Sequence, residues 1–125
     1  MSFDINILIG AQLINFDDEG FTVIKDGKTF SFEYYCYEGD CSSYIEIETE
    51  LYVNLSDTSN NPVITKVEGL PCNDPGQCCE ITLYGLYKPM AKAFISADSD
   101  SGCGYGACVQ LHCNQTNEPV ELVSY

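Results

Sequence analysis

The sequence predicts an all-β fold, an antiparallel β-sandwich or jelly-roll of about eight strands that disulfides stabilise. Apolar and polar residues alternate along most of the chain, and this period is typical of half-buried strands. Five prolines and many other turn residues interrupt the alternation at short intervals. Eight cysteines in 125 residues indicate cross-links between the turns. A closed barrel is the alternative architecture.

The chain length suits one domain. At 125 residues the chain is too short for two independent cores, so we expect residues 1–125 to form a single β-sandwich domain. Hydrophobic residues make up 45% of the chain, which is enough apolar surface to drive folding. No segment shows the apolar period of an amphipathic helix.

The first expected strand covers Phe3–Leu13. Its apolar side chains occupy every second position: Phe3, Ile5, Ile7, Ile9, Ala11 and Leu13. Because alternate residues of a strand share one face, we expect a long N-terminal strand with one buried side.

The segment FTVIKDGKTFSF predicts a β-hairpin. Asp26-Gly27 suits a two-residue type I′ turn, in which both central residues have positive φ. A hairpin centred there pairs Val23 with Phe30 and Phe21 with Phe32 on one face. Such apolar cross-strand pairs stabilise a sheet.

The segment YIEIETELYV predicts a strand with two different faces. One face carries Ile45, Ile47, Thr49, Leu51 and Val53, and the other carries Glu46, Glu48 and Glu50. One side is therefore expected to be buried and the other to be wet and acidic. Carboxylates about 7 Å apart along a strand repel one another unless cations or lysines lie nearby.

Prolines and polar loops divide the rest of the chain into further strands. The expected segments are Val63–Val67, Glu80–Lys88, Ala91–Ala97, Ala107–Cys113 and Val120–Tyr125. Pro71, Pro75, Pro89 and Pro119 lie at or between these segments, where a missing N–H does least harm to a sheet.

The charge of the chain is strongly unbalanced. It has 19 acidic residues against five lysines and no arginine, and its formal net charge is −14. Nucleic-acid binding depends on neutralising phosphates, so we expect no nucleic-acid partner. Anionic lipid repels the same surface, and we expect no insertion into a membrane. An acidic surface instead attracts cations and basic patches on other proteins.

All eight cysteines are candidates for disulfides: Cys36, Cys41, Cys72, Cys78, Cys79, Cys103, Cys108 and Cys113. Cys36 and Cys41 flank the short turn YEGD, and Cys103 and Cys108 flank GYGA, so each pair can come within bridging range. The adjacent Cys78 and Cys79 point to opposite faces of a strand and need different partners, for which Cys72 and Cys113 are candidates. Short-loop bridges each stabilise by about 2–3 kcal/mol.

Structural zinc is the competing interpretation of the C-terminal cysteines. Cys103, Cys108, His112 and Cys113 bring three thiols and the only histidine into one short segment. Zinc sites usually open with two ligands on a tight knuckle, and no C-x-x-C occurs in this chain. A solvent-facing strand histidine is the simpler interpretation of His112.

Asp98 and Asp100 are candidate calcium ligands, because the run DSDSG places carboxylates at alternate positions. An EF-hand loop counted from Asp98 would need glycine at Cys103 and glutamate at Val109, and both positions fail. A looser oxygen cage would need help from the acidic turn at residues 17–19. The alternative is an ordinary turn. Beyond these calcium and zinc alternatives we expect no cofactor.

The sequence gives no support for catalysis. It contains no nucleophile elbow, no phosphate-binding loop and no arginine that could clamp an anion. His112 and Cys113 are neighbours on an expected strand, so their side chains face away from each other. We therefore expect that the protein is not an enzyme.

The cysteine content is typical of an oxidising compartment. The N-terminal run MSFDINILIGAQ has no basic segment, and Asp4 and Asn6 interrupt its apolar residues, so it does not resemble a secretory signal. No stretch approaches the roughly 20 apolar residues that cross a bilayer. We expect an extracellular or virion location, reached after removal of a signal or by another route.

These observations favour a structural or interaction module of an extracellular assembly, such as a virion decoration, a neck or tail component, or a surface-filament subunit. The expected partners are copies of the chain or other proteins of the assembly. The terminal strands are the expected contact segments, through Phe3, Ile5, Ile7, Val120, Leu122 and Tyr125. Burial of these segments within their own sheet is the alternative.

Two other functions remain open. A secreted lectin-like or inhibitor-like module would line its ligand surface with the tyrosines Tyr34, Tyr35, Tyr37 and Tyr44, because tyrosine is a rigid, amphipathic recognition residue. A zinc-binding structural module is the second alternative.

Overall fold

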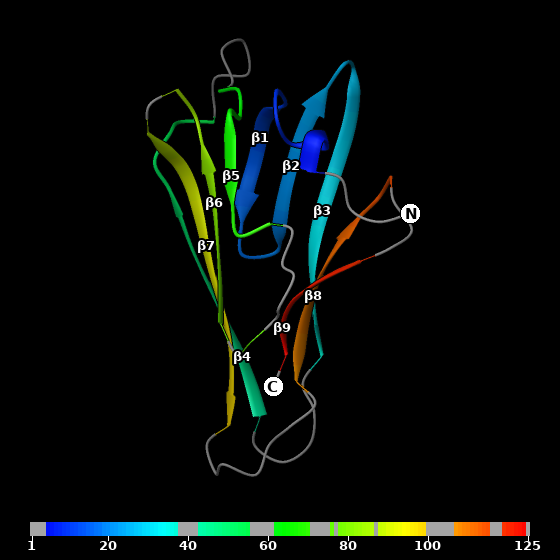
Figure 1. Cartoon of the computed structure of the whole chain (residues 1–125), viewed down its shortest axis with the longest axis vertical. Helices are drawn as coiled ribbons and strands as arrows, with labels where there is room; N and C mark the ends of the chain where they lie inside the picture. Colours follow the sequence, from blue (N-terminus) through cyan, green and yellow to red (C-terminus); the bar gives the residue numbers. More distant parts are fainter. Residues whose placement is uncertain are drawn as a thin grey trace.

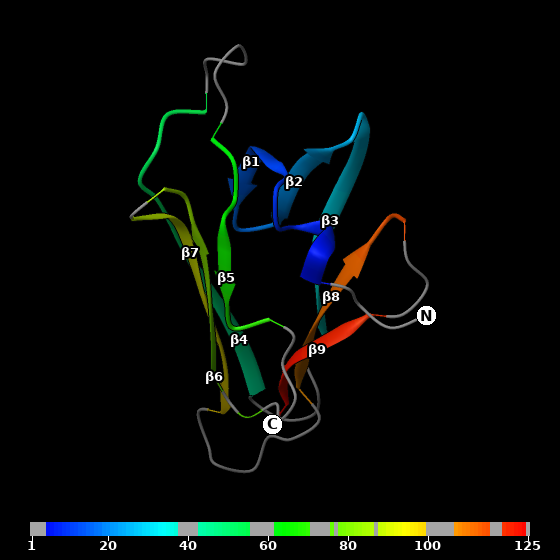
Figure 2. The same ribbon diagram turned by 45° about the horizontal axis from the view of Figure 1, so that its top comes forward.

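A computed structural model describes residues 5–37, 43–55, 62–70, 76, 78–86, 88–99, 107–115 and 119–124. These residues form nine strands in two antiparallel sheets, with one 3-10 turn, η1 (Ile5–Ile7), and no α-helix among them. The predicted all-β class is confirmed. The two sheets form the two layers of a sandwich (Figures 1 and 2).

The first sheet has five strands in the order β1-β2-β3-β8-β9. They are β1 (Gln12–Asp17), β2 (Gly20–Lys25), β3 (Lys28–Tyr37), β8 (Cys108–Cys113) and β9 (Val120–Ser124). The second sheet has four strands in the order β4-β7-β6-β5. They are β4 (Ser43–Leu51), β7 (Pro89–Ser99), β6 (Cys78–Tyr84) and β5 (Lys66–Glu68).

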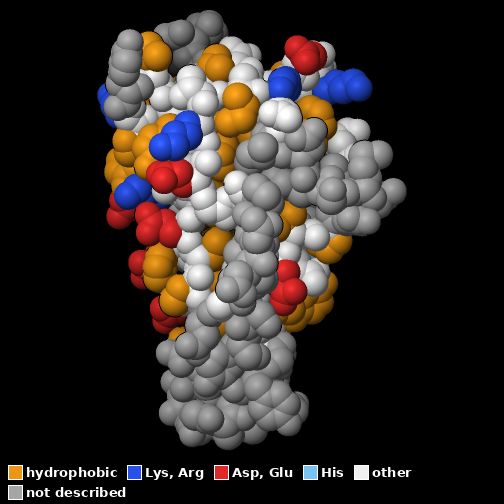
Figure 3. Space-filling model, in the orientation of Figure 1, with side chains coloured by type: hydrophobic (Ala, Val, Ile, Leu, Met, Phe, Trp, Pro, Cys, Tyr) orange, Lys and Arg blue, Asp and Glu red, His pale blue; other side chains and the backbone are white. Residues whose placement is uncertain are grey.

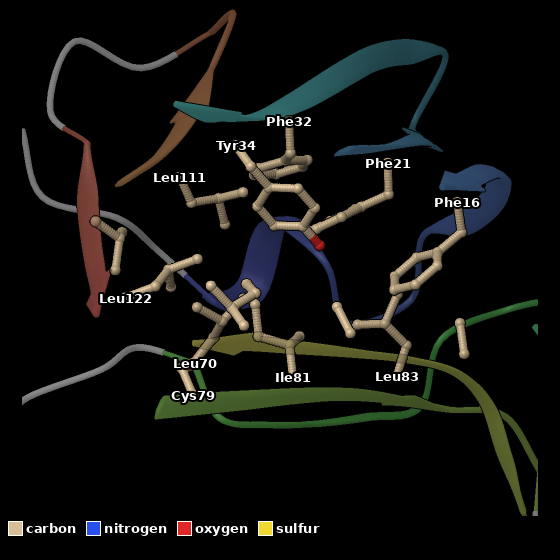
Figure 4. Packing of buried hydrophobic residues seen from close by; sticks show 14 of the residues in the cluster. Phe16, Phe21, Phe32, Tyr34, Leu70, Cys79, Ile81, Leu83, Leu111 and Leu122 are labelled. Atoms are coloured by element: carbon tan, nitrogen blue, oxygen red, sulfur yellow. The ribbon is translucent and has the colours of Figure 1, made fainter. Parts of the chain in front are cut away.

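Side chains from both sheets meet in one hydrophobic core between the layers (Figure 4). The ring of Phe21 stacks on Phe32 at a centroid distance of 4.7 Å and on Phe16 at 5.6 Å. From the other layer, Ile81 and Leu83 of β6 are fully buried. Three of the buried residues of β7 are alanines, and its buried set is Met90, Ala91, Ala93, Ile95 and Ala97. Large rings on one layer are thus combined with small side chains on the other, which helps to fill the core.

β2 and β3 form the predicted hairpin. Asp26 has a φ of 53° and Gly27 a φ of 78°, as a type I′ turn requires. The Cα partners include Phe21 with Phe32 and Val23 with Phe30. The Asp26-Gly27 turn therefore predicts the observed register between β2 and β3.

The predicted alternation along β4 is confirmed for Ile45–Glu50, whereas Leu51, which was expected on the buried side, has 43% of its surface exposed. Glu46, Glu48 and Glu50 are exposed, whereas Ile45 and Ile47 are half-buried. β4 pairs with β7 along its whole length, from Ser43 to Leu51.

The predicted N-terminal strand over Phe3–Leu13 is wrong for the residues that the structure describes. Ile5–Ile7 form η1, and β1 begins only at Gln12. Gly10 adopts a φ of 86°, a left-handed conformation that breaks an extended run and that glycine tolerates well. The apolar alternation misled the prediction because a buried turn also needs apolar side chains.

Lys25 holds this N-terminal turn against β2. Its ammonium donates to the carbonyl oxygen of Asn6 and, at 2.8 Å, to that of Ile9. In a strand these carbonyl oxygens would accept from a neighbouring strand, whereas here they accept from the Lys25 side chain.

The other strand boundaries differ from the predictions by a few residues. β5 begins only at Lys66, and Val63 instead makes an isolated antiparallel bridge to Gln12 of β1. β6 ends at Tyr84, and β7 begins at Pro89, a position where proline costs a sheet little.

Candidate interaction site on the second sheet

Two open sheets have four edge strands, and β4 is the most accessible of them. On β1, Leu13 N–H donates to the carbonyl of Pro62 at 2.9 Å, so the outer side of that strand is partly occupied. β5 has only three residues, and β9 carries a parallel bridge from Gly76 to Val123. β4 has nine residues and, in the part of the chain that the structure describes, pairs only with β7.

The ladder between β4 and β7 determines which backbone groups of β4 point outward. Just beyond the strand, Tyr52 N–H donates to Met90 C=O at 2.8 Å, continuing the β4–β7 register. Hydrogen-bonded pairs alternate along an antiparallel ladder, so the even-numbered residues of β4 bond β7. The N–H and C=O groups that face away from β7 belong to Ile45, Ile47, Thr49 and Leu51. We call this row of backbone groups the open edge.

The outward side of the second sheet is acidic, and we call it the acidic face. Its carboxylates on β4 and β6 are Glu46, Glu48, Glu50 and Glu80. In the register, Phe94 of β7 lies between Glu48 and Glu80, and 44% of its surface is exposed. Lys92 lies 3.5 Å from the Glu80 carboxylate. Acidic side chains gather along the left side of Figure 3, over this sheet.

Phe94 and Lys92 also line a shallow hollow on the acidic face. Its volume is about 240 Å³, and its other lining residues are Glu48, Glu50 and Glu80. Phe94 was not among the residues predicted to be functional. The period-two pattern along β7 could have identified it, because that pattern places Phe94 on the same side as Lys92 and Ser96.

Some carboxylates of this sheet accept hydrogen bonds from tyrosines. Tyr52 donates its hydroxyl to Glu50, and Tyr84 donates to Glu68 on β5. Each bond raises the pKa of the tyrosine, because the carboxylate stabilises the protonated phenol. Among the described residues, Glu46 and Glu48 make no hydrogen bond or ion pair, so their charges remain available to a partner.

A cleft of about 550 Å³ lies beside the inner side of β4. Ile47 of β4 forms one wall, and the other walls come from the first sheet, including Phe21 and Tyr34. The carboxylates that line the cleft are Asp17, Asp18, Glu19 and Glu33. Thr49 of β4 donates from its hydroxyl to Asp18 at 2.6 Å, which ties β4 to the β1–β2 turn.

Tyr34 is the unusual residue of this cleft. Its hydroxyl is buried and has no hydrogen-bond partner in the described part of the chain. Figure 4 shows the oxygen directed between the layers toward the opposing sheet. Burial raises the pKa of Tyr34, and the charges of Cys79, Asp17 and Asp18 raise it further. The group therefore stays protonated and offers a hydrogen-bond donor inside the protein.

The structure describes five of the eight cysteines. Cys78 is exposed and Cys79 is buried, so the predicted opposite orientation is confirmed. Cys113 is buried, Cys108 is half-buried and Cys36 is exposed. No disulfide joins two described cysteines.

Cys41, Cys72 and Cys103 lie outside the described residues, so every bridge that would use one of them stays a prediction. Burial and the nearby Glu121 raise the pKa of Cys108. A thiol with a raised pKa carries little thiolate at neutral pH and is a poor nucleophile.

The expected zinc ligands are divided between the two faces of β8. Cys108 and His112 lie on the partly exposed face, and Cys113 points into the core. His112 contacts the ring of Tyr35 edge-on, at a centroid distance of 4.0 Å, and its Nε2 lies 3.1 Å from Oε1 of Gln110. Within the described ranges, no three His, Cys, Asp or Glu side chains are grouped as metal ligands would be.

The expected calcium site stays a prediction, because the side chains of its candidate ligands lie outside the described part of the chain. Asp98 is a residue of β7 opposite Tyr44, and its side chain and all of Asp100 lie outside the described part. Thr49, which contacts Asp18, is five positions along β4 from Tyr44, so about 17 Å of strand separates the two regions.

The carboxylate of Asp17 is used locally. It accepts the backbone N–H groups of Glu19 at 2.9 Å and Gly20 at 3.2 Å. This is the ordinary way in which an aspartate closes a turn.

Three of the expected assembly residues have described side chains, and all three pack into the fold. Val120 and Leu122 are buried, and Ile7 packs against the core. Ile5 belongs to η1, whereas Phe3 and Tyr125 lie outside the described residues.

The four expected recognition tyrosines do not share a surface. Tyr34 points into the core, Tyr35 and Tyr37 are exposed on the other side of β3, and Tyr44 belongs to the second sheet.

Comparison of the chain with family models, with curated proteins and with solved structures finds no significant match. None of the helical residues that the structure describes forms a segment long and apolar enough to cross a membrane.

Proposed function

We propose that the protein is a non-enzymatic interaction module of an extracellular assembly and that it joins a neighbour through β4. The observation that carries this proposal is the open edge. Along this nine-residue strand, a row of backbone donors and acceptors pairs with no strand in the described part of the chain, and such a row is a ready template for another strand. The contact segment is therefore internal, and it replaces the terminal strands that the sequence favoured.

The chemistry of the described side chains supports a non-catalytic role. His112 and Cys113 face opposite sides of β8, so they cannot act as a nucleophile and base pair. The raised pKa of Cys108 works against a nucleophilic thiolate. The acidic face and its exposed Phe94 are instead suited to contact with another macromolecule.

Sedimentation tests the proposal directly. Purified protein is centrifuged alone and with the extracellular particles of its source, either virions or surface filaments. We expect the wild-type chain to co-sediment with those particles, and we expect Glu48→Lys to weaken this more than Glu121→Lys, which changes charge equally on β9. A strictly monomeric chain that co-sediments with no particle would contradict the proposal.

The proposed extracellular location is tested separately, by the oxidation state of the cysteines. Intact mass under non-reducing conditions counts the disulfides, because each bridge removes two hydrogen atoms. We propose that bridges involving Cys41, Cys72 or Cys103 form in an oxidising compartment. Eight reduced thiols in protein recovered from the extracellular particles would contradict that location.

A further inference from the structure

If the chain joins its assembly through β4, as proposed above, the chemistry of the joining segment follows from the strand itself. We infer that the open edge accepts an extended segment of a partner protein in which lysine or arginine alternates with apolar residues. The segment adds to the β4-β7-β6-β5 sheet as a further strand. Its basic residues lie on the acidic face, and its apolar residues lie on the opposite side, beside Ile45 and Ile47.

The backbone provides the first part of this recognition. The outward groups of Ile45, Ile47, Thr49 and Leu51 pair with the backbone of the added strand without regard to its side chains. Ile47 and Thr49 are at the middle of this row, and Leu51, at its end, has 43% of its surface exposed. A strand of ordinary length can therefore bond the whole edge.

The acidic face provides the second part, which is selectivity for charge. An added strand places every second side chain opposite Glu46, Glu48 and Glu50, at non-hydrogen-bonded positions where cross-strand side chains approach most closely. Glu46 and Glu48 make no ion pair with described residues. Basic side chains at alternate positions would neutralise these carboxylates, whereas acidic ones would be repelled.

The inner side of β4 provides the third part, which is the apolar set, because Ile45 and Ile47 are partly buried there against the core. Ile47 is an edge residue whose side chain lines the cleft, so the neighbouring residues of an added strand point to the same side. Apolar side chains there would cover the exposed parts of Ile47 and of Ile45.

A second copy of the chain does not fit this edge. Two β4 strands related by a two-fold axis must pair odd residues with odd residues, because those carry the outward backbone groups of both copies. Glutamates of one copy then lie opposite glutamates of the other, at the positions of closest approach. Like charges directly opposite each other are destabilising, so the edge selects a basic partner over itself.

A synthetic peptide tests this inference. The probe is acetylated and amidated, alternates lysine with isoleucine and threonine, and is long enough to span Glu46–Glu50. We expect binding by calorimetry, with backbone amide shifts in nuclear magnetic resonance spectra that centre on Ile45–Leu51. Replacing the lysines by glutamates should abolish binding.

Two controls separate strand addition from general attraction between charges. Methylating the peptide nitrogens that would face β4 keeps all charges but removes the ladder donors, so it should abolish binding. Glu48→Lys should weaken binding about tenfold, because it replaces an attractive cross-strand pair with a repulsive one. Glu121→Lys makes the same change in net charge away from the site and should change the affinity far less.

The inference is overturned if the methylated peptide binds as well as the parent or if the amide shifts map outside β4. It is also overturned if the lysine peptide does not bind. In that last case, co-sedimentation of the protein with particles would leave the proposed function intact, and its absence would remove both.

Discussion

At the scale of single residues, Tyr34 shows how the cleft differs from the rest of the core. Its ring packs beside Phe21 at a centroid distance of 6.4 Å, whereas its hydroxyl lacks a partner among the described residues. A buried donor without an acceptor costs about 1–3 kcal/mol relative to a satisfied one. Such a cost is tolerated where a site needs a polar group.

Removing the hydroxyl of Tyr34 should therefore not weaken the fold. We expect Tyr34→Phe to keep or raise the free energy of unfolding, by up to about 2 kcal/mol, in urea denaturation. Tyr84→Phe removes an exposed hydroxyl and should change stability by less than about 0.5 kcal/mol. A clear loss of stability in Tyr34→Phe would mean that the hydroxyl has a structural partner.

Tyr34 also predicts a response to alkaline pH. Its pKa is raised in the folded protein, so folding favours the protonated phenol. This contribution is fully present below the ordinary tyrosine pKa of about 10 and is lost as the pH rises above it. We expect wild-type stability to fall more steeply than that of Tyr34→Phe above about pH 10. Parallel curves for the two proteins would argue against a buried phenol.

Gly20, which follows the turn between β1 and β2, has no space for a side chain. It has a φ of 154°, and a Cβ atom there would lie 1.9 Å from the carbonyl oxygen of Phe32. Gly20→Ala must displace backbone, so we expect a loss of about 2–4 kcal/mol in the free energy of unfolding. Gly76→Ala is the matched control, since a Cβ atom at Gly76 would meet nothing within 4 Å. Equal effects of the two substitutions would contradict the close approach at Gly20.

At the scale of elements, the sequence predicts the hairpin and β4 because local chemistry determines both. The turn at Asp26-Gly27 needs two positive φ angles, and β4 repeats its polar and apolar residues without a break. The N-terminal segment carries the same apolar period but folds as η1 and a turn. There Gly10 and the long-range contact from Lys25 override the pattern.

Local sequence patterns also predict only one part of the candidate site, its charged side chains. The charges of Glu46, Glu48 and Glu50 can be read from alternation alone. Which strand stands at an edge depends on pairings between segments far apart in sequence, such as β4 with β7. The cleft, with Ile47 and Tyr34 in its walls, depends on how the two sheets pack, and local patterns do not encode this directly.

At the scale of the whole molecule, the acidic character serves two purposes. A net charge of −14 makes copies of the chain repel one another. On β4 the same charges protect a long edge that could otherwise pair with copies of itself. In the proposed complex a basic partner segment would turn this repulsion into attraction, so the same glutamates would oppose self-pairing and favour the partner.

Neutralising the three glutamates of β4 should therefore cause self-association. We expect the combined variant Glu46→Gln, Glu48→Gln and Glu50→Gln to dimerise or aggregate at neutral pH, as measured by sedimentation velocity. The matched control removes equal charge from exposed positions elsewhere, through Asp26→Asn, Glu68→Gln and Glu121→Gln. Equal association of the two variants would mean that net charge alone, and not the β4 edge, keeps the chain monomeric.

Amide hydrogen exchange along β4 tests the central claim most directly. In the protein alone we expect fast exchange at Ile47, Thr49 and Leu51, whose N–H groups face outward, and slow exchange at Glu46, Glu48 and Glu50, which bond β7. Adding the lysine-alternating peptide should slow the fast set and leave the slow set unchanged. Uniform protection of all six amides in the protein alone would show that the edge is already covered and would contradict the account.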